Sequence, residues 1–345
     1  MNILLTCAGR RNYLVNYFKE ALRGIGKVIA TDTQYNAPAL ADADVAVEVP
    51  FITDPNYIKV LLQICKQNDV DAILSLNDLE LPILASHKPV FTENGVAVIV
   101  SDPVVIDTCF DKWKTQLFLQ KLGIRTPKTY LSLREVSEAI SQGEVSFPLI
   151  IKPRWGSASI GIEVVETFEE LELAYRLLTI RLKRSILSAA GDAVTDQVIL
   201  FQEKLVGQEY GMDVINDLDG NYVASFAKKK MGMRDGETDK AQLIADSRFD
   251  ELGERVGTGL RHIGNLDIDV FDTPNGLYVL ELNPRFGGGY PFTHQGGVNV
   301  PAILVEWLKG GNQIQQFLRF SPGQSFAKCD RILEVFSGHL VEKYY

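Results

Sequence analysis

The chain has few cysteines, and its basic residues are outnumbered by acidic ones. Four cysteines occur among 345 residues, and no two of them have the spacing of a zinc site or of a disulfide framework. We therefore expect reduced thiols in a cytoplasmic protein. Lysine and arginine number 35 against 44 aspartates and glutamates, a net charge of −9. Because nucleic-acid phosphates need a basic surface, this balance argues against a nucleic-acid partner.

Long apolar runs are also absent. No stretch reaches the roughly 18 apolar residues of a membrane-spanning helix. The first residues, MNILLTCAGRR, carry their arginines after the apolar part, unlike a secretory signal peptide. We therefore expect no membrane partner. The composition is nevertheless 46% hydrophobic, which is enough for the cores of two or three domains.

The first hundred residues alternate between short apolar runs and helical patterns. Strands are predicted over residues 2–9, 27–32, 71–78 and 95–102, and helices over 13–26 and 57–70. This alternation is typical of a parallel, doubly wound α/β sheet. Pro103 then interrupts the chain, and residues 104–124 predict one or two helices.

The remainder has a different pattern, in which turn signals separate many strands. Strands are predicted over 147–153, 160–166, 198–205, 209–216, 221–231, 266–273 and 277–284. Helices are predicted over 168–188 and 300–311, with a last strand or helix after Phe326. This part is expected to be α+β with antiparallel sheets.

The turn after the first strand, CAGRRNY, has some features of a dinucleotide-binding fold, and Asp32 ends the next strand. Only Gly9 is present, however, of the three glycines that a nicotinamide site requires. Arg10 and Arg11 stand at the helix start, where they could face an anion. Asn77, Asp78 and Glu80 follow another strand end, and a ligand site and a solvated loop are equally open there.

The segment IIKPRWGSASIGI places small residues between Gly156 and Gly161. It is not a P-loop, because Ile162 stands where that motif has its lysine. Lys152 instead ends the preceding strand. Such a loop can fold over a triphosphate while the lysine supplies a fixed cation. A surface hairpin with an exposed lysine is the alternative.

Acidic residues mark two further places. Glu203 ends a strand and Glu209 begins the next, which suits an adenine seat with a carboxylate for the ribose, or a hairpin with solvated acids. Further along, Asp269 shares a strand face with Asp267, and Glu281 shares one with Asn283. A hairpin between these strands would bring Asp269, Glu281 and Asn283 together as oxygen ligands for Mg²⁺. A solvent-facing polar side is the alternative, and it explains Asp267 well.

Taken in order, these motifs resemble the ATP-grasp superfamily, and within it the branch like the large subunit of carbamoyl-phosphate synthase. The resemblance covers nearly the whole chain and is most specific at ELNPRFGG and IIKPRWGSASIG. It implies an ATP-grasp fold, combining α/β and α+β parts. Residues 1–103 would form a parallel α/β, Rossmann-like pre-ATP-grasp domain. Residues 104–203 would form a helical connection and a small lid subdomain, and 204–345 a subdomain with the metal site.

The resemblance also implies roles for individual residues. Lys112 and Lys152 would contact the nucleotide phosphates, Asp269, Glu281 and Asn283 would bind Mg²⁺ or Mn²⁺, and Arg285 with Lys152 would act in catalysis. The lid loop would be Gly156, Ser157, Ala158, Ser159 and Gly161, and the nucleoside site Glu203, Lys204, Leu205 and Glu209. Substrate candidates are Arg10, Asn77, Asp78, Glu80, Arg234, Gly288 and His294, the last being equally consistent with an ordinary loop histidine. Which of Lys228, Lys229, Lys230 and Arg234 contacts the phosphates stays open.

The resemblance implies an ATP-dependent ligase. It would join a small carboxylate, with amino acids among the candidates, to an amine through an acyl phosphate. The expected partners are small molecules, and a homodimer is compatible with the family. A kinase-like phosphotransferase, a non-catalytic nucleotide-binding protein and a nicotinamide-dependent oxidoreductase are the alternatives.

Overall fold

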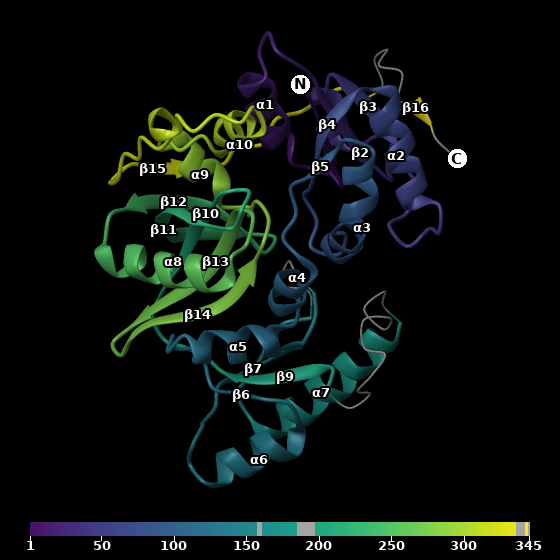
Figure 1. Cartoon of the computed structure of the whole chain (residues 1–345). Coiled ribbons are helices and arrows are strands. Elements are labelled where there is room, and N and C mark those ends of the chain that lie inside the picture. The colour runs from purple at the N-terminus through teal and green to yellow at the C-terminus, as the bar shows by residue number, and fades with distance from the viewer. Residues whose placement is uncertain (157–160, 185–196, 336–341, 344–345) are drawn as a thin grey trace.

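The structure, a computed structural model, describes residues 1–156, 161–184, 197–335 and 342–343. Three sheets form its framework, and Figure 1 shows them as three bodies grouped around a common centre. The helices α4 (Pro103–Phe110) and α5 (Lys112–Lys121) connect the N-terminal sheet to the small sheet. Within the described ranges, we find no helix with both the length and the apolar character needed to cross a membrane.

The N-terminal sheet is parallel and has the strand order β16-β3-β2-β1-β4-β5. Its strands are β1 (Asn2–Thr6), β2 (Val28–Asp32), β3 (Val45–Glu48), β4 (Val70–Ser75), β5 (Ala97–Val98) and β16 (Glu342–Lys343). Ile3 and Leu5 pack in one core with α1 (Asn12–Ala21) and α10 (Val300–Leu308). Leu4 packs on the other face with α2 (Tyr57–Gln67) and α3 (Leu81–Glu93). Burial of both faces accounts for the continuous apolar run of β1.

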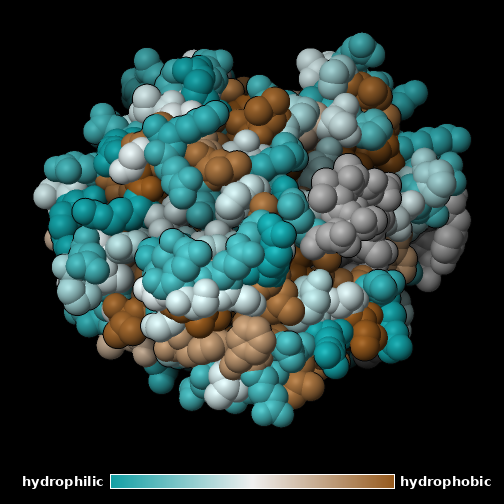
Figure 2. Space-filling view, turned by 90° about the horizontal axis from the view of Figure 1, so that it is seen from below, coloured by the Kyte–Doolittle hydropathy of each residue, from teal (hydrophilic) through white to brown (hydrophobic). Residues whose placement is uncertain are grey.

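The small sheet is antiparallel, with the order β6-β9-β7-β8. Its strands are β6 (Thr129–Tyr130), β7 (Leu149–Pro153), β8 (Glu163–Val165) and β9 (Ile199–Glu203). Leu149 and Ile151 of β7 pack with α6 (Leu133–Ser141) and α7 (Phe168–Lys183). Because strand residues alternate, Lys152 lies on the opposite face. Figure 2, seen from below, shows hydrophobic residues in several separate groups among hydrophilic ones.

The large sheet has the order β14-β13-β10-β11-β12-β15 and is antiparallel. Its strands are β10 (Gln208–Asn216), β11 (Tyr222–Arg234), β12 (Glu237–Ile244), β13 (Gly264–Thr273), β14 (Gly276–Asn283) and β15 (Ser325–Ala327). Leu266, Ile268 and Val270 of β13 pack with α8 (Ser247–Leu260). Asp267 and Asp269 therefore lie on the other face.

The predicted fold class is confirmed: a parallel α/β sheet precedes antiparallel sheets. Several elements were not predicted from the sequence, namely β3, α3, α6, β12, α8 and α9 (Tyr290–Gln295). Pro82 and Pro89 obscure α3, although a proline is tolerated in the first turn. Glycines obscure α8, yet a Cβ at Gly253 would overlap Ser225, so this glycine allows α8 to pack closely on β11.

Other predicted elements change their limits. The strand predicted over 95–102 is only Ala97–Val98, and α9 follows directly on the glycines after Phe286. The helix predicted over 168–188 is α7, which ends at Lys183, while residues 185–188 lie outside the described residues. The predicted domain limits at 103 and 203 stay a prediction.

Candidate active site

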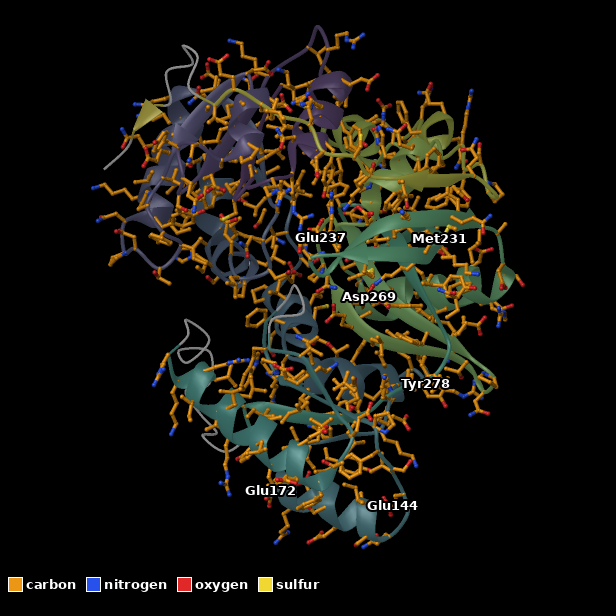
Figure 3. All side chains as sticks on the ribbon, turned by 180° about the vertical axis from the view of Figure 1, so that it is seen from behind. Glu144, Glu172, Met231, Glu237, Asp269 and Tyr278 are labelled. Atoms are coloured by element: carbon orange, nitrogen blue, oxygen red, sulfur yellow. The ribbon has the colours of Figure 1, made fainter. Side chains whose placement is uncertain are left out.

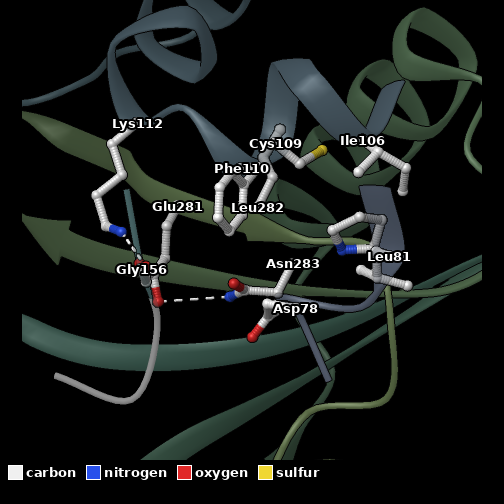
Figure 4. A pocket seen from close by; sticks show the side chains of 11 residues that line it. Asp78, Leu81, Ile106, Cys109, Phe110, Lys112, Gly156, Glu281, Leu282 and Asn283 are labelled. Carbon is white, nitrogen blue, oxygen red and sulfur yellow. Dashed lines mark hydrogen bonds between the residues drawn. The ribbon is translucent and has the colours of Figure 1, made fainter. Parts of the chain in front are cut away.

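The β13–β14 hairpin gathers polar side chains on one face. In its register Asp269 lies opposite Glu281, and Asp267 lies opposite Asn283. Asn283 Nδ2 donates to Glu281 Oε1 at 3.4 Å, and Figure 4 shows this pair beside Lys112 and Gly156. The structure thus brings together the three residues predicted as metal ligands. It corrects the solvent-facing interpretation of Asp267, whose side chain is only 14% exposed.

Two lysines approach this hairpin from the side of the small sheet. Lys112 begins α5, and the Asp111 side chain caps that helix and binds Arg154. Lys152 is 6% exposed and donates to Gln202 Oε1 at 2.9 Å. Burial and the charge of Lys112 lower the pKa of Lys152 to about 8. Two cations held together in this way favour an anion between them.

The same lysines act on Glu281. Burial would raise the pKa of its carboxyl group, but the charges of Lys112 and Lys152 outweigh burial and lower it. Glu281 therefore stays ionised at neutral pH. Lys112 Nζ also donates to the Gly156 carbonyl at the start of the predicted lid loop. The cavity between these groups has a volume of about 10 Å³, room for roughly one water molecule.

Lys230 of β11 forms ion pairs with two carboxylates near the hairpin. Its ammonium donates to Glu209 Oε1 and to Asp269 Oδ1, each at 2.6 Å, and its side chain is 7% exposed. Burial and the neighbouring acids Asp267 and Glu281 raise the pKa of Asp269 to about 7, although Lys230 opposes this. One Asp269 oxygen is therefore already engaged by a cation.

The other basic candidates on this strand have different partners. Lys228 is fully buried and donates to Asp213 Oδ2 at 2.6 Å. Arg234 forms a two-pronged ion pair with Asp330 at 2.9 and 3.0 Å. Strand alternation places Lys229 on the face opposite to Lys228 and Lys230. Lys230 is thus the basic residue of this group that the fold brings to the predicted site.

Arg285 links the hairpin to the N-terminal domain. Its guanidinium donates to Asp78 Oδ2 at 2.8 Å and to Asp267 Oδ2 at 3.1 Å. Burial would lower the pKa of Arg285, but the charges of Asp78 and Asp267 outweigh burial and raise it. Asp78 therefore belongs to the site although it lies 207 residues away in sequence.

The three glycines after Phe286 have a steric explanation. A Cβ at Gly287 would overlap the Asp267 carboxylate. A Cβ at Gly288 would lie 2.8 Å from the Glu237 carboxylate, and one at Gly289 would lie 2.5 Å from the Lys228 side chain. Each glycine thus admits one charged side chain close to the backbone. Glu237, from the start of β12, was not predicted because that strand was missed.

The predicted nucleoside site lies where β9 of the small sheet passes into β10 of the large sheet. Glu203 accepts from the Lys128 backbone at 2.8 Å. Within the described ranges, the backbone groups of Lys204 and Leu205 make no hydrogen bond to other backbone. These backbone N–H and C=O groups are therefore available to form hydrogen bonds with the edge of an adenine ring. Of the lid loop, Gly156 and Gly161 have positive φ, while Ser157, Ala158 and Ser159 lie outside the described residues.

Other substrate candidates have local structural partners. Asn77 Oδ1 accepts from the Leu79 backbone in a tight turn, and His294 stacks on Tyr17 with ring centroids 3.5 Å apart. Asp32 accepts from the Gly9 amide at 2.8 Å. The acid that a dinucleotide ribose would need is therefore used to fix the turn. Arg10 is exposed and lines a separate cleft with Arg234.

The predicted substrate role of Glu80 is corrected by its surroundings. Its side chain is fully buried, and its carboxylate accepts from Thr6, Tyr57 and Ser75, each at 2.6 Å. Glu80 lies only two positions after Asp78, but it faces the interior and stabilises the ends of β1 and β4.

We expect Glu80→Ala to lower the free energy of unfolding by about 3 kcal/mol or more, because three buried hydroxyls lose their acceptor. Urea denaturation followed by circular dichroism measures this loss. Glu93→Ala, at an exposed position near the end of α3, is the matched control and should change little. An unchanged stability in Glu80→Ala would contradict a structural role.

The oxygen ligands of the hairpin suit a hard cation. No group of three or more His, Cys, Asp or Glu side chains fit to hold a metal occurs in the part of the chain that the structure describes. Mg²⁺ commonly takes only one or two carboxylates and completes its shell with water and nucleotide phosphates. Glu281, Asn283 and the free oxygen of Asp269 fit that pattern.

Comparisons with known proteins show the family and the fold of the chain. A model of the PylC-like N-terminal domain matches residues 3–99, and a model of the ATP-grasp domain matches residues 109–289. Biotin carboxylase from Campylobacter jejuni superposes with a TM-score of 0.73 at 17% identity, covering 94% of this chain and 74% of that chain.

Two further solved structures have the same fold. The L-amino acid ligase from Bacillus licheniformis has a TM-score of 0.66 at 19% identity, covering 94% of this chain and 78% of that one. The N5-carboxyaminoimidazole synthetase from Staphylococcus aureus, complexed with ADP, has a TM-score of 0.67 at 15% identity, with coverages of 94% and 79%. Because the ATP-grasp model matches more than half of the residues, the chain belongs to the ATP-grasp family.

Proposed function

We propose that the protein is an ATP-dependent ligase that joins a small carboxylate to an amine through an acyl phosphate. The observation that carries this proposal is the meeting of opposite charges between the hairpin and the small sheet. Glu281 and Asn283 lie on β14, Lys112 begins α5 and Lys152 lies on β7 of the small sheet. The charges of both lysines act on Glu281. A triphosphate with its metal needs such an arrangement, with cations for the phosphates and carboxylates for the metal.

In this proposal each part has a task. Lys112 and Lys152 bind phosphate oxygens, and the backbone at Lys204 and Leu205 binds adenine. Glu281, Asn283 and Asp269 hold Mg²⁺, which would neutralise charge on the transferred phosphoryl group. Arg285 stabilises that group and the oxyanion of the second step. Phosphates entering the small cavity would replace the Gly156 carbonyl on Lys112.

The proposed chemistry has two steps. An oxygen of the substrate carboxylate attacks the γ-phosphorus, and the bond from that phosphorus to the ADP oxygen breaks. The amine nitrogen then attacks the acyl carbon, the carbon–oxygen bond to phosphate breaks, and the nitrogen gives its proton to phosphate or solvent. Exclusion of water protects the acyl phosphate between the steps.

The similar proteins support this reading. The names of two of them, an L-amino acid ligase and a synthetase, describe bond-forming enzymes, and the second carries ADP. The free cysteines Cys7, Cys65, Cys109 and Cys329 support our proposal of a cytoplasmic location. A homodimer remains part of the proposal, since a carboxylase domain of this fold is described as a dimer.

The test combines nucleotide binding with product analysis. Calorimetry should detect ATP binding that strengthens with Mg²⁺, and phosphate release should depend on both a carboxylate and an amine. Mass spectrometry of the product separates ligation, which forms an amide and free phosphate, from a kinase-like outcome, which leaves a phosphorylated product. Absence of ATP binding with and without Mg²⁺ would refute the proposal.

A further inference from the structure

A second cleft, separate from the predicted phosphate site, is lined by charged residues of both signs. Its volume is about 560 Å³, within the range of small-molecule sites. The start of α1, the β11–β12 hairpin, α9 and the segment after β15 contribute its walls. We call it the charged cleft. Four of its lining residues are basic, Arg10, Arg11, Arg234 and Lys328, and four are acidic.

Some of these charges neutralise one another. Arg234 is held by Asp330 through two hydrogen bonds. Glu237 lies between two cations, with Arg11 at 3.6 Å and Lys328 at 3.2 Å, and its side chain remains 45% exposed. Burial would raise the pKa of Glu237, but Arg11 and Lys328 lower it. Its carboxylate is therefore ionised and open to the cleft.

Arg10 differs from the other basic residues of the cleft. It is exposed, and within the described ranges its side chain forms no hydrogen bond or ion pair. Arg11 donates to the Tyr13 hydroxyl at 2.9 Å and lines the cleft together with Arg10. Two guanidinium groups at adjacent positions thus meet the cleft, and planar guanidinium groups bind carboxylates well.

The charged cleft is close to the reacting groups. The Glu237 carboxylate packs on Gly288, and the Asp267 carboxylate packs on the neighbouring Gly287. Asp267 in turn binds Arg285, whose charge also acts on Glu237. Figure 3 shows Glu237 and Asp269 at the junction of the large sheet and the N-terminal domain. A molecule bound against Glu237 would therefore lie beside the glycines that follow Arg285.

From this geometry we propose that the charged cleft binds the amine substrate, and that this amine is a free amino acid. Its carboxylate binds Arg10 and Arg11, and its amino group lies against Glu237 and points toward Arg285. The balance of four basic and four acidic lining residues suits a zwitterion, whereas a polyanion would meet repulsion from the acids. This inference rests on the proposed ligase function and specifies one of its substrates.

The experiment uses calorimetry on the full chain with Mg²⁺ and a non-hydrolysable ATP analogue. Each proteinogenic amino acid is titrated separately, and each that binds is then compared with its carboxamide and its N-acetyl form. We expect at least one amino acid to bind. Both modified forms should bind at least about 10-fold more weakly, because each loses one charge-assisted contact.

Three variants locate the binding. Glu237→Gln and Arg10→Ala should each weaken amino-acid binding at least about 10-fold and leave the ATP analogue bound as before. Gly288→Ala, which places a methyl group against Glu237, should weaken it too. Glu251→Gln, on an exposed part of α8, is the matched control and should bind normally.

The outcomes separate the two proposals. Binding of the ATP analogue without binding of any amino acid overturns the assignment of the cleft and leaves the ligase proposal standing. Amino-acid binding that survives both Glu237→Gln and Arg10→Ala also overturns it. Failure of the ATP analogue to bind the unmodified chain overturns the ligase proposal itself.

Discussion

Replacing Glu281 with glutamine should lower turnover by more than about 100-fold while the chain stays folded. Partners that only orient a metal ligand cost about 10–100-fold when lost, and a ligand itself should cost more. Glu281 is the proposed ligand whose pKa is lowered by Lys112 and Lys152, so it carries its charge throughout the neutral range. Glutamine keeps the shape and removes that charge.

The measurement is phosphate release at several Mg²⁺ concentrations, with circular dichroism to confirm folding. If Glu281 holds the metal, part of the loss should be recovered at high Mg²⁺ or Mn²⁺. Glu163→Gln is the matched control, since Glu163 lies on β8 in an exposed ion pair with Arg181. Turnover close to that of the unmodified chain in Glu281→Gln would show that the metal site is elsewhere.

The hairpin of the site could be predicted because its signals are local. Period-two alternation places Asp269 and Glu281 on defined faces, and the turn between them sets the pairing. The structure has this pairing, with Asp269 directly opposite Glu281. A solvent-facing position suited Asp267 because alternation tells which face a side chain lies on, but not which other residues pack on that face. The residue that packs on Asp267 is Arg285, which lies 18 residues further along the chain.

Contacts between distant parts of the chain determine which of several candidate residues reach the site, and the sequence alone does not show these contacts. Asp78 and Glu80 follow the same strand, yet Asp78 reaches Arg285 while Glu80 turns inward to three hydroxyls. The three consecutive lysines were equally ambiguous. Lys230 is distinguished from the other two lysines only by its hydrogen bonds to Glu209 and Asp269. These two acids lie on the neighbouring strands β10 and β13. Glycines and prolines hid α8 and α3, although tertiary packing makes both helical.

The site concentrates like charges, and this should reduce the stability of the fold. Lys152 is buried, and Lys112 lies close enough to disfavour its charge as well. Such conflicts are expected where binding requires them, because a ligand of opposite charge resolves them. The unliganded protein should therefore become more stable when the buried cation of Lys152 is removed.

We expect Lys152→Met to abolish turnover and yet stabilise the unliganded protein. A pKa lowered from 10.5 to about 8 corresponds to roughly 3 kcal/mol of destabilisation at neutral pH. The lost hydrogen bond to Gln202 offsets about 1 kcal/mol of the gain.

The stabilisation should depend on pH. Between pH 8 and 10.5 the unfolded chain holds the Lys152 proton and the folded chain does not, so the stability of the unmodified protein rises with pH there. The advantage of the variant should be full below pH 8 and small near pH 10.5. Urea-denaturation midpoints at pH 7 and pH 10 test this, with Lys121→Met, exposed at the end of α5, as the control. A variant less stable than the unmodified chain at pH 7 would show that Lys152 stabilises the fold. It would contradict the view that Lys152 destabilises the unliganded protein and serves to bind phosphate.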